Sequence, residues 1–227
     1  MYFQNKPMRL KYKCLVLDHD DTVVDSTAKI HFPAFLEALR VMRPGVTMEL
    51  EEYFKVNFTP GFLEYCTGTL HMTEAELDQE VEIWKNYVKN HIPTAYPGMK
   101  EIIELQKSLG GKVCVVSHSY DFNIRRDYEA NDLPAPDMIF GWECPQEQRK
   151  PSPYALEKIA QTYQIKPSEM VMVDDLKPGY DMAKAYGVPF VGAGWANDIV
   201  EIRDFMKRNS DYYFTSVEQL KKFLFEA

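Results

Sequence analysis

Short apolar runs that stop abruptly at polar residues constrain the fold of this chain more than any other feature of its sequence. Each run contains Val or Ile, and none alternates apolar with polar residues. Such runs are typical of strands buried on both faces, as in a parallel sheet that helices cover on each side. We therefore predict a parallel sheet made from Cys14–Leu17, Val113–Val116, Met138–Phe140, Met170–Val173 and Val188–Val191.

Helix signals lie between most of these runs. Glycine follows Leu109 and Tyr186, and glycine directly after a helical stretch is a C-cap signal. Ser216 and Gln219 have the spacing of a capping box, which marks the start of a helix. The predicted helices are residues 98–109, 152–163 and 179–186, and a last helix that begins at Ser216. This alternation predicts an α/β fold with a doubly wound, Rossmann-like core.

The segment 26–97 breaks the alternation, because it contains helix signals and no expected strand. Thr73 and Glu76 form a capping box before apolar residues at helical spacing, and Ala34–Met42 is a second amphipathic stretch. Such a segment is too long for a crossover between neighbouring strands. We predict an inserted all-helical domain at residues 26–97, in a core formed by residues 1–25 and 98–227. Its Met and aromatic residues are expected to form mainly its own core.

The composition excludes several classes of function. The 227 residues include 26 Lys and Arg against 34 Asp and Glu, a formal net charge of −8. Because nucleic-acid binding relies on basic contacts with phosphate, we expect no nucleic-acid partner. No apolar stretch approaches a membrane span or a secretory signal, so neither is expected. The cysteines lack C-x-x-C spacing, and buried thiols at Cys14 and Cys114 fit a reducing cytoplasm. We expect a cytoplasmic monomer or homodimer.

Polar groups follow three of the predicted strands. Ligands in open α/β sheets bind beyond the carboxyl ends of the strands. Aspartates that cap the next helix would explain one acid at each strand end, but not two. Acids gathered at one edge repel one another unless a hard cation lies among them, and Mg²⁺ prefers oxygen ligands of this kind. The residues at these strand ends are Asp18 and Asp20, Ser117 and His118, and Asp174 and Asp175.

Lys150 supplies a cation that the strand ends lack. It stands in the segment RKPSP directly before a predicted helix, so we expect it in a constrained loop rather than on a helix face. An acidic chain repels phosphate at long range, so anion chemistry must be organised by a local cation or a metal. Beside a divalent ion, the Lys150 ammonium would act as a point charge for a phosphate oxygen.

These residues stand in the order of the four motifs of the haloacid dehalogenase superfamily, which the chain resembles over nearly its whole length. The first motif corresponds to residues 18–26, DHDDTVVDS, and the second to Ser117. The third corresponds to Lys150 and the fourth to the pair Asp174-Asp175, followed by Gly179. The predicted helical insertion resembles the small all-helical cap of this superfamily.

The resemblance implies a Mg²⁺-dependent phosphatase that acts on a small phosphorylated metabolite through an aspartyl-phosphate. Asp18 would be the nucleophile, and Asp20 the general acid and then the general base. The residues that would bind the substrate phosphate are Ser117, His118 and Lys150, assisted by backbone N–H groups near His19 and Ser119. The residues that would bind Mg²⁺ directly are Asp18, Asp175 and, through its backbone carbonyl, Asp20. Asp174 would bind the ion through a water molecule or would contact one of the residues that bind it.

Some positions depart from the common pattern of the superfamily. His19 stands where apolar residues are common, and His118 where Asn or another polar residue is frequent. For both we expect packing within a loop or contact with substrate rather than catalysis. Asp21 replaces a frequent Gly, which raises the local negative charge and with it the need for a metal. Candidate cap residues in contact with substrate are Arg40, Phe62, Tyr65 and Trp84.

Two other functions stay open. A phosphomutase similar to beta-phosphoglucomutase would share the paired acids of the fourth motif. A non-catalytic receiver that is phosphorylated on aspartate also combines acids with Ser or Thr and Lys, but such modules are much shorter and carry the acid pair on the first strand. For a phosphatase, the resemblance makes phosphoglycolate or a sugar phosphate the first candidates. Dehalogenase activity is disfavoured, because that branch has no use for Asp20 or a metal.

Overall fold

The computed structural model describes residues 9–225, and the chain divides into two compact units. The larger unit joins the residues up to Val23 with those from Ala95 onwards, and the smaller unit is Val24–Thr94. The sequence analysis placed the division after residues 25 and 97. Within the described range, no helix is both long enough and apolar enough to cross a bilayer.

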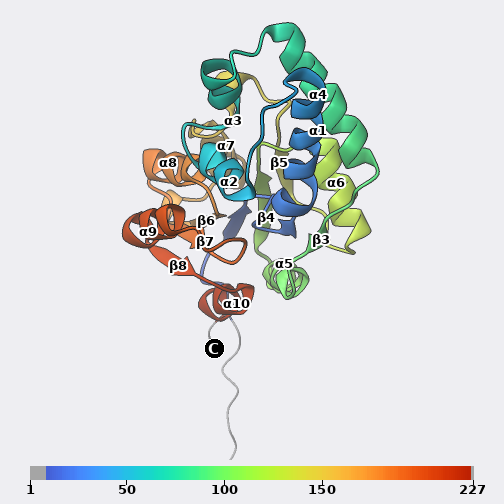
Figure 1. Ribbon diagram of the computed structural model, residues 1–227. Coiled ribbons are helices and arrows are strands. Elements are labelled where there is room, and N and C mark those ends of the chain that lie inside the picture. The colour runs from blue at the N-terminus through green and yellow to red at the C-terminus, as the bar shows by residue number, and fades with distance from the viewer. Residues whose placement is uncertain (1–8, 226–227) are drawn as a thin grey trace, which may run out of the picture. The chain divides into compact units, whose positions relative to one another are not determined.

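The larger unit is built on a six-stranded sheet in which all neighbouring strands run parallel. The strand order is β5-β4-β1-β6-β7-β8 (Figure 1). The strands are β1 (Cys14–Leu17), β4 (Lys112–Val116), β5 (Met138–Phe140), β6 (Met170–Asp174), β7 (Phe190–Ala193) and β8 (Tyr212–Phe214). The central strands β1 and β6 are buried along their whole length, as expected of strands that are apolar except for Asp174 at the end of β6.

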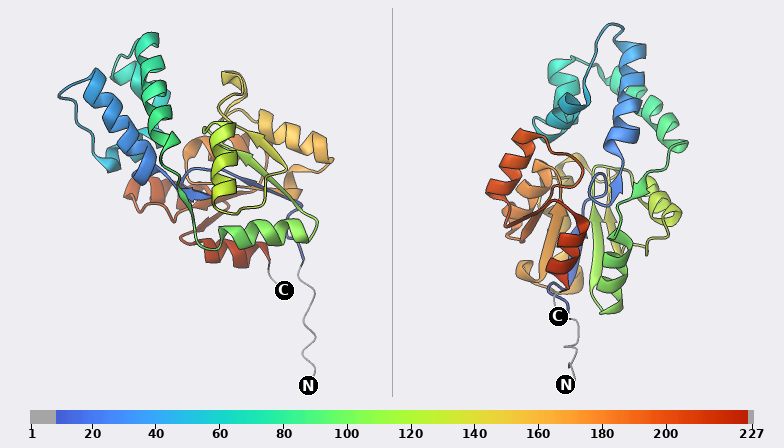
Figure 2. Two further views of the ribbon diagram at one scale, coloured as in Figure 1. Left: turned by 90° about the vertical axis from the view of Figure 1, so that its right-hand side faces the viewer. Right: turned by 60° about the horizontal axis from the view of Figure 1, so that its bottom comes forward.

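Helices cover both faces of this sheet (Figure 2). The connections from β1 to β4 and on to β5 run in one direction across the sheet, and those from β5 through β6 and β7 to β8 run in the other. Right-handed crossovers in opposite directions place their helices on opposite faces, so the predicted α/β doubly wound fold is confirmed. The helices are α5 (Met99–Ser108), α6 (Asp121–Ala130), α7 (Tyr154–Tyr163), α8 (Lys177–Tyr186), α9 (Val200–Asn209) and α10 (Val217–Leu224), with short 3₁₀ turns at Gln146–Gln148 and Pro167–Glu169.

The predicted strands and helices of this unit are confirmed, although several of their ends lie one or two residues from the predicted ones. β7 begins at Phe190 instead of Val188, because Pro189 has no N–H to give to a strand ladder. The sequence analysis misses β8, a short edge strand that is partly exposed. It also misses α6 and α9, and α6 buries Asn123 and Asp127 among its apolar residues, which hides its inward face from an apolar pattern.

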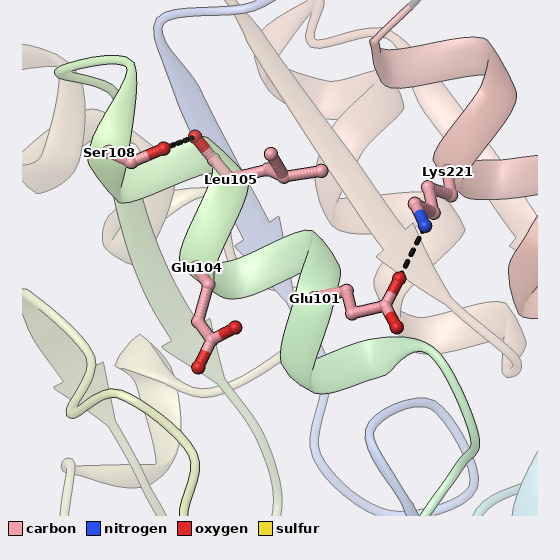
Figure 3. Close-up of a pocket in the computed structure, with 5 residues that line it drawn as sticks. All are labelled: Glu101, Glu104, Leu105, Ser108 and Lys221. Atoms are coloured by element: carbon pink, nitrogen blue, oxygen red, sulfur yellow. Dashed lines mark hydrogen bonds and ion pairs between the residues drawn. The ribbon is translucent and has the colours of Figure 1, made fainter.

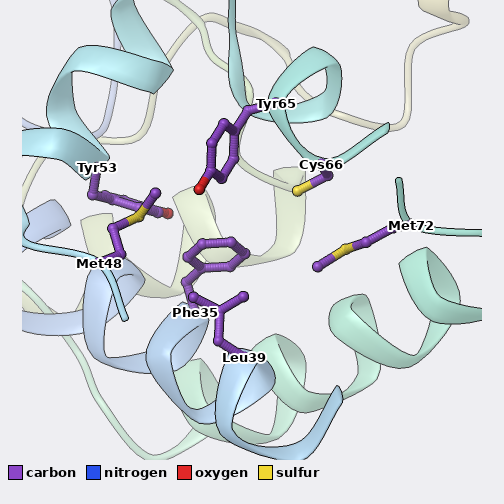
Figure 4. Close-up of a cluster of buried hydrophobic side chains, with 7 residues drawn as sticks. All are labelled: Phe35, Leu39, Met48, Tyr53, Tyr65, Cys66 and Met72. Carbon is purple, nitrogen blue, oxygen red and sulfur yellow. The ribbon is translucent and has the colours of Figure 1, made fainter. Parts of the chain in front are cut away.

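The smaller unit is helical. Its helices are α1 (Phe32–Met42), α2 (Leu50–Phe58), α3 (Phe62–Glu64) and α4 (Glu74–Lys89), with single π turns at Thr27–His31 and Tyr65–Thr69. The predicted capping box begins α4: Thr73 Oγ1 accepts the N–H of Glu76 at 3.4 Å, and Glu76 Oε2 accepts the N–H of Thr73 at 2.9 Å. Aromatic and Met side chains gather in its centre, as predicted (Figure 4). They form a cluster of Phe35, Leu39, Met48, Tyr53, Tyr65, Cys66 and Met72.

The two chain segments that join the units pair with each other. β2 (Val24–Asp25) and β3 (Thr94–Ala95) form a two-stranded sheet of their own. The expectation of no strand between residues 26 and 97 was therefore wrong for β3, whose two residues are too few to produce a sequence pattern. Next to this ladder, the N–H of Tyr96 donates to the carbonyl of Val23 at 2.9 Å.

Candidate active site

The carboxyl ends of three neighbouring strands meet at the centre of the sheet. β1 lies between β4 and β6, and Leu17 pairs with Val115 on one side and with Val173 on the other. Asp18, the next residue, donates its backbone N–H to the Val173 carbonyl at 2.9 Å. Asp18 therefore stands level with Asp174 at the end of β6, although the two are far apart in the sequence.

Lys150 lies between these two carboxylates. Its ammonium donates to Asp18 Oδ1 at 2.8 Å and to Asp174 Oδ2 at 2.7 Å. The side chains of Lys150, Asp18 and Asp174 are only 4%, 5% and 0% exposed. Burial lowers the pKa of Lys150, but the two carboxylates outweigh burial and hold this pKa above its ordinary value. The lysine stays charged and offsets part of the negative charge at the strand ends.

Side-chain contacts hold the loop that carries Lys150. The ring Nε2 of His118 lies 3.1 Å from the Lys150 carbonyl, and because a carbonyl only accepts, this nitrogen carries the proton. The neighbouring Arg149 places its guanidinium 4.0 Å from the centre of the Trp142 ring and donates to the Cys144 carbonyl at 2.7 Å. Lys150 thus stands in a constrained loop, and His118 contacts the backbone of that loop.

Asp174 uses both of its oxygens within the protein. Oδ2 accepts from Lys150, and Oδ1 accepts the backbone N–H of Leu176 at 2.8 Å. Complete burial nevertheless raises the pKa of Asp174 to about 7. The space for this side chain depends on Gly179 in α8, where an added Cβ would lie 2.1 Å from Asp174 Oδ2. The glycine of the fourth motif therefore leaves room for the acid.

The carboxylate of Asp175 has weaker hydrogen-bond donors around it than that of Asp174. It is buried, and the hydroxyl of Thr22 donates to its Oδ1 at 3.5 Å, the upper limit of a hydrogen bond. Burial and then the carboxylates of Asp21 and Asp174 raise the pKa of Asp175 well above its ordinary value. One oxygen from each of Asp18, Asp174 and Asp175 lies within 4.8 Å of the other two. This buried set of hard oxygen donors fits a divalent cation, which would offset charge that one ammonium does not.

Asp21 has an unusual backbone conformation. Its φ is 56°, in the left-handed region that glycine adopts most readily. The sharp turn at this position explains why glycine is frequent there in the superfamily. The aspartate that replaces it is buried and contributes to the raised pKa of Asp175. It therefore adds negative charge to the centre that would hold the metal.

Two serines bring Asp20 together with the end of β4. Asp20 is partly exposed, and the hydroxyl of Ser119 donates to its Oδ2. The N–H of Ser119 donates to Ser117 Oγ at 3.1 Å, and the N–H of Ser117 donates to the Phe140 carbonyl at 2.9 Å. The structure thus gathers Asp18, Asp20 and Ser117 at one edge of the sheet. The sequence analysis named Ser119 only for its backbone and misses its side chain.

His19, the second residue of the first motif, is fully buried. Its Nε2 lies 3.1 Å from Asp127 Oδ2, and its ring stacks on Tyr128 with ring centres 5.9 Å apart. Both partners belong to α6, so His19 ties the loop after β1 to that helix. This contact agrees with the expected packing in the loop. The sequence analysis misses Asp127 and Tyr128 because it predicts no helix there.

Several residues considered as substrate contacts have partners inside the smaller unit. Tyr65 belongs to the buried cluster, and Phe62 packs against that cluster. The Trp84 indole N–H donates to His31 Nδ1 at 3.0 Å, and Arg40 pairs with Glu37 on the exposed side of α1. The packing of Phe62 and Tyr65 is explained by the core of this unit alone.

A surface pocket lies away from the strand ends, between α5 and α10 (Figure 3). It is lined by Glu101, Glu104, Leu105, Ser108 and Lys221. Lys221 forms an ion pair with Glu101 across it, and Ser108 donates to the Leu105 carbonyl at 3.0 Å. The lining residues include none of the groups at the strand ends.

Comparison with known protein families identifies the family of this chain. A family described as haloacid dehalogenase-like hydrolase matches residues 15–193. The chain belongs to this family. The matched range begins in β1 and ends with β7, so it includes all of the haloacid dehalogenase motif residues described above. No curated protein matches the chain.

Solved structures of haloacid dehalogenase-like proteins share the fold at low sequence identity. A haloacid dehalogenase-like hydrolase from Bacteroides fragilis has a TM-score of 0.76 at 22% identity, covering 92% of this chain and 100% of its own. A predicted phosphoglycolate phosphatase from Haemophilus somnus has a TM-score of 0.73 at 18% identity, covering 94% and 98%. CbbY from Rhodobacter sphaeroides, in complex with xylulose-1,5-bisphosphate, has a TM-score of 0.70 at 19% identity, covering 90% and 94%.

Proposed function

We propose that this hydrolase is a Mg²⁺-dependent phosphatase of small phosphomonoesters that works through an aspartyl-phosphate on Asp18. The observation that carries the proposal is the buried ammonium of Lys150, bonded to Asp18 and Asp174 at the ends of neighbouring strands. Such an ammonium orients the Asp18 carboxyl group through a hydrogen bond, which a positioned nucleophile requires. It also supplies positive charge where a transferring phosphoryl group becomes more negative.

In the first half-reaction, a carboxylate oxygen of Asp18 forms a bond to phosphorus while the bond from phosphorus to the ester oxygen breaks. The electron pair of the broken bond leaves with the ester oxygen, and the protonated carboxyl of Asp20 gives it a proton, so an alcohol departs. Lys150 stabilises the added charge on the phosphoryl oxygens. Ser117, whose hydroxyl lies at the same edge, is proposed to donate to one of these oxygens.

In the second half-reaction, water replaces the alcohol. The carboxylate of Asp20 takes one proton from water while the water oxygen forms a bond to phosphorus. The bond between phosphorus and Asp18 breaks, and its electron pair restores the carboxylate. The sum of both halves is a phosphomonoester plus water giving an alcohol plus inorganic phosphate.

The residues proposed to hold Mg²⁺ are Asp18, Asp175 and the backbone carbonyl of Asp20. Asp174 would bind the ion through a water molecule or would contact one of these ligands, because both of its oxygens already accept hydrogen bonds from the protein. When bound, the metal would supply positive charge to the nucleophile and the phosphate. Asp175 is the acid that gains most from it, since its own pKa is raised well above the ordinary value by burial and by neighbouring acids.

The proposed substrate is a small phosphorylated metabolite, with phosphoglycolate and sugar phosphates as the first candidates. Structural neighbours described as phosphoglycolate phosphatases and CbbY with its bisphosphate support this class. We propose that the smaller unit, residues 26–97 in the sequence analysis, is a cap that selects the leaving group. Phosphate release from a panel of phosphorylated metabolites would identify the substrate, with the Asp18→Asn protein as the blank. Turnover retained by Asp18→Asn would refute the nucleophile and the proposed mechanism.

A phosphomutase remains the second candidate, because the pair Asp174-Asp175 is the arrangement expected of a beta-phosphoglucomutase. The two activities differ in what attacks the aspartyl-phosphate, since a mutase transfers the group to a sugar hydroxyl instead of water. Incubation with a sugar phosphate and a sugar bisphosphate distinguishes them. Inorganic phosphate without an isomerised sugar would exclude the mutase, and an isomerised sugar without phosphate would exclude the phosphatase.

A further inference from the structure

We propose that Ser119 is a positioning residue for Asp20, which it orients and prepares for proton transfer. The inference rests on the proposed function, because it concerns the residue that protonates the leaving group there. The direct observation is the hydrogen bond from the Ser119 hydroxyl to Asp20 Oδ2. It joins the loop after β1 to the loop after β4 through a side chain rather than through the backbone.

Ser119 is itself held in place from several directions. Its N–H donates to Ser117 Oγ at 3.1 Å, and its carbonyl accepts the N–H of Trp142 at 2.9 Å. The residue is 5% exposed. Gly141 lies so close that an added Cβ would be 2.8 Å from the Ser119 carbonyl oxygen. A hydroxyl on such a fixed backbone holds its partner more precisely than one on a mobile loop.

The chemistry of Asp20 gives this bond a specific consequence. A hydroxyl that donates to Oδ2 occupies that oxygen, so the proton that Asp20 transfers is carried on Oδ1. After the transfer Asp20 is a carboxylate, and a hydrogen bond to a carboxylate is stronger than one to the neutral acid. Ser119 therefore stabilises Asp20 more as the leaving oxygen takes the proton. This benefit matters only where the leaving group needs an acid.

Leaving groups of different basicity test the inference. The measured quantity is kcat/KM, which reports the steps up to the aspartyl-phosphate, for an alkyl phosphate and for 4-nitrophenyl phosphate. A nitrophenolate leaves without a proton, whereas an alkoxide needs one. For Ser119→Ala we expect kcat/KM to fall about 10- to 100-fold with the alkyl phosphate, which is part of the ~10²–10⁴-fold rate increase that a general acid provides. With 4-nitrophenyl phosphate we expect kcat/KM to fall less than about threefold.

Two further variants keep the test decisive. Ser119→Cys keeps the size and a weak donor, so it should show the same selectivity to a smaller extent even if the Ala variant fails to fold. Ser210→Ala is the matched control, because the Ser210 hydroxyl is buried in the same unit and has no hydrogen-bond partner. It should leave kcat/KM unchanged with both substrates.

The outcomes separate this inference from the function on which it rests. An equal loss with both substrates in both Ser119 variants, or no loss in either, would overturn the positioning role while leaving the phosphatase intact. Asp20→Asn must also lower kcat/KM more with the alkyl phosphate than with 4-nitrophenyl phosphate, and by a larger factor than Ser119→Ala. If it does not, Asp20 is not the general acid and the positioning role of Ser119 is overturned. Turnover retained by Asp18→Asn would instead overturn the proposed mechanism itself.

Discussion

Two buried carboxylates, one in each unit of the molecule, are neutralised in different ways. Asp174 at the end of β6 accepts hydrogen bonds from the Lys150 ammonium and from a backbone N–H. Glu80 in α4 is 6% exposed, and no lysine or arginine among the described residues bonds to it. Burial raises the pKa of Glu80 to about 7, although His31 counteracts this shift. The comparison shows that the larger unit surrounds its buried carboxyl group with hydrogen-bond donors, one of them a cation, whereas the smaller unit leaves the effect of burial on Glu80 largely unopposed.

Removal of the lysine is expected to have the largest effect. Lys150→Met leaves Asp18 and Asp174 buried without their cation, which costs about 3–5 kcal/mol in unfolding free energy. It should also lower kcat by about 10²–10³-fold or more, because the proposed donor to the transferring phosphoryl group is lost. Urea denaturation and phosphate release measure the two effects.

Lys184→Met is the control for this variant. Lys184 pairs with Asp211 at 2.9 Å on the surface, where an ion pair contributes less than about 1 kcal/mol. A loss of stability in Lys150→Met no larger than that in the control would show that Asp18 and Asp174 do not depend on the cation.

A methyl group at Gly179 should displace Asp174 without removing any charge. Gly179→Ala forces the Asp174 carboxylate to move, since the new Cβ would overlap it, and overpacking of this kind costs about 1–3 kcal/mol. We expect kcat/KM to fall about 10- to 100-fold, because small shifts of catalytic groups are costly. Phosphate release checks this result.

Gly68→Ala in the smaller unit is the matched change. There the new Cβ would contact only the flexible end of the Glu64 side chain, at 3.1 Å. Unchanged activity in both variants would contradict the role of Gly179 as the space for Asp174.

The proton on Glu80 makes stability depend on pH. Its pKa is about 7 in the folded protein against an ordinary value of 4.5, so the folded state binds more protons between these values. The free energy of unfolding should therefore fall as the pH rises from about 4.5 to 7 and then level off, by at most about 3 kcal/mol for this group. Comparing wild type with Glu80→Gln by urea denaturation at pH 5.5 and 8.5 isolates the contribution.

In Glu80→Gln this part of the pH dependence should vanish, while the exposed Glu74→Gln should retain it. The same slope in wild type and Glu80→Gln would mean that Glu80 is ionised in the folded protein, and the contrast with Asp174 would disappear.

The smallest effect concerns Asp21. Asp21→Gly relieves a left-handed backbone and removes a buried charge beside Asp175, so the metal-free protein should gain about 1 kcal/mol. The same change should reduce the rise in Tm that millimolar Mg²⁺ produces, because one negative charge near the metal is lost. Thermal melts with Mg²⁺ and with a chelator measure both.

Gln164→Gly separates the two causes, since Gln164 has a φ of 53° but carries no charge. It should stabilise the protein without altering the effect of Mg²⁺. An undiminished effect of Mg²⁺ in Asp21→Gly would show that Asp21 does not contribute to metal binding.

The edge that carries the candidate site was predictable because parallel strands carry their carboxyl ends to one side. Asp18, Asp174 and Asp175 directly follow apolar runs, so the topology places them together. For Lys150 the sequence indicated a constrained loop and a local cation, but its place beside the strand ends followed only from the resemblance to a known motif, since nothing in its segment reveals which side chains it will contact.

Other parts of the site were not predictable, for physical reasons. Ser119 stands beyond the end of its strand, where the alternation of side chains no longer determines their direction. Asp127 is a polar residue on the buried face of α6, and it reaches His19 only through the tertiary fold. The pKa of Glu80 likewise depends on packing, because α4 presents this residue to the interior despite its charge.

The hydrogen bond between Tyr96 and Val23 has a consequence for protein engineering. The chain leaves the larger unit at Val23 and returns at Ala95, and these two points are already neighbours. A tight turn can therefore replace the whole insert without stretching the backbone of either β1 or α5. The same junction is a suitable place to exchange the insert for that of a relative, and such a chimera would test the proposal that the smaller unit selects the substrate.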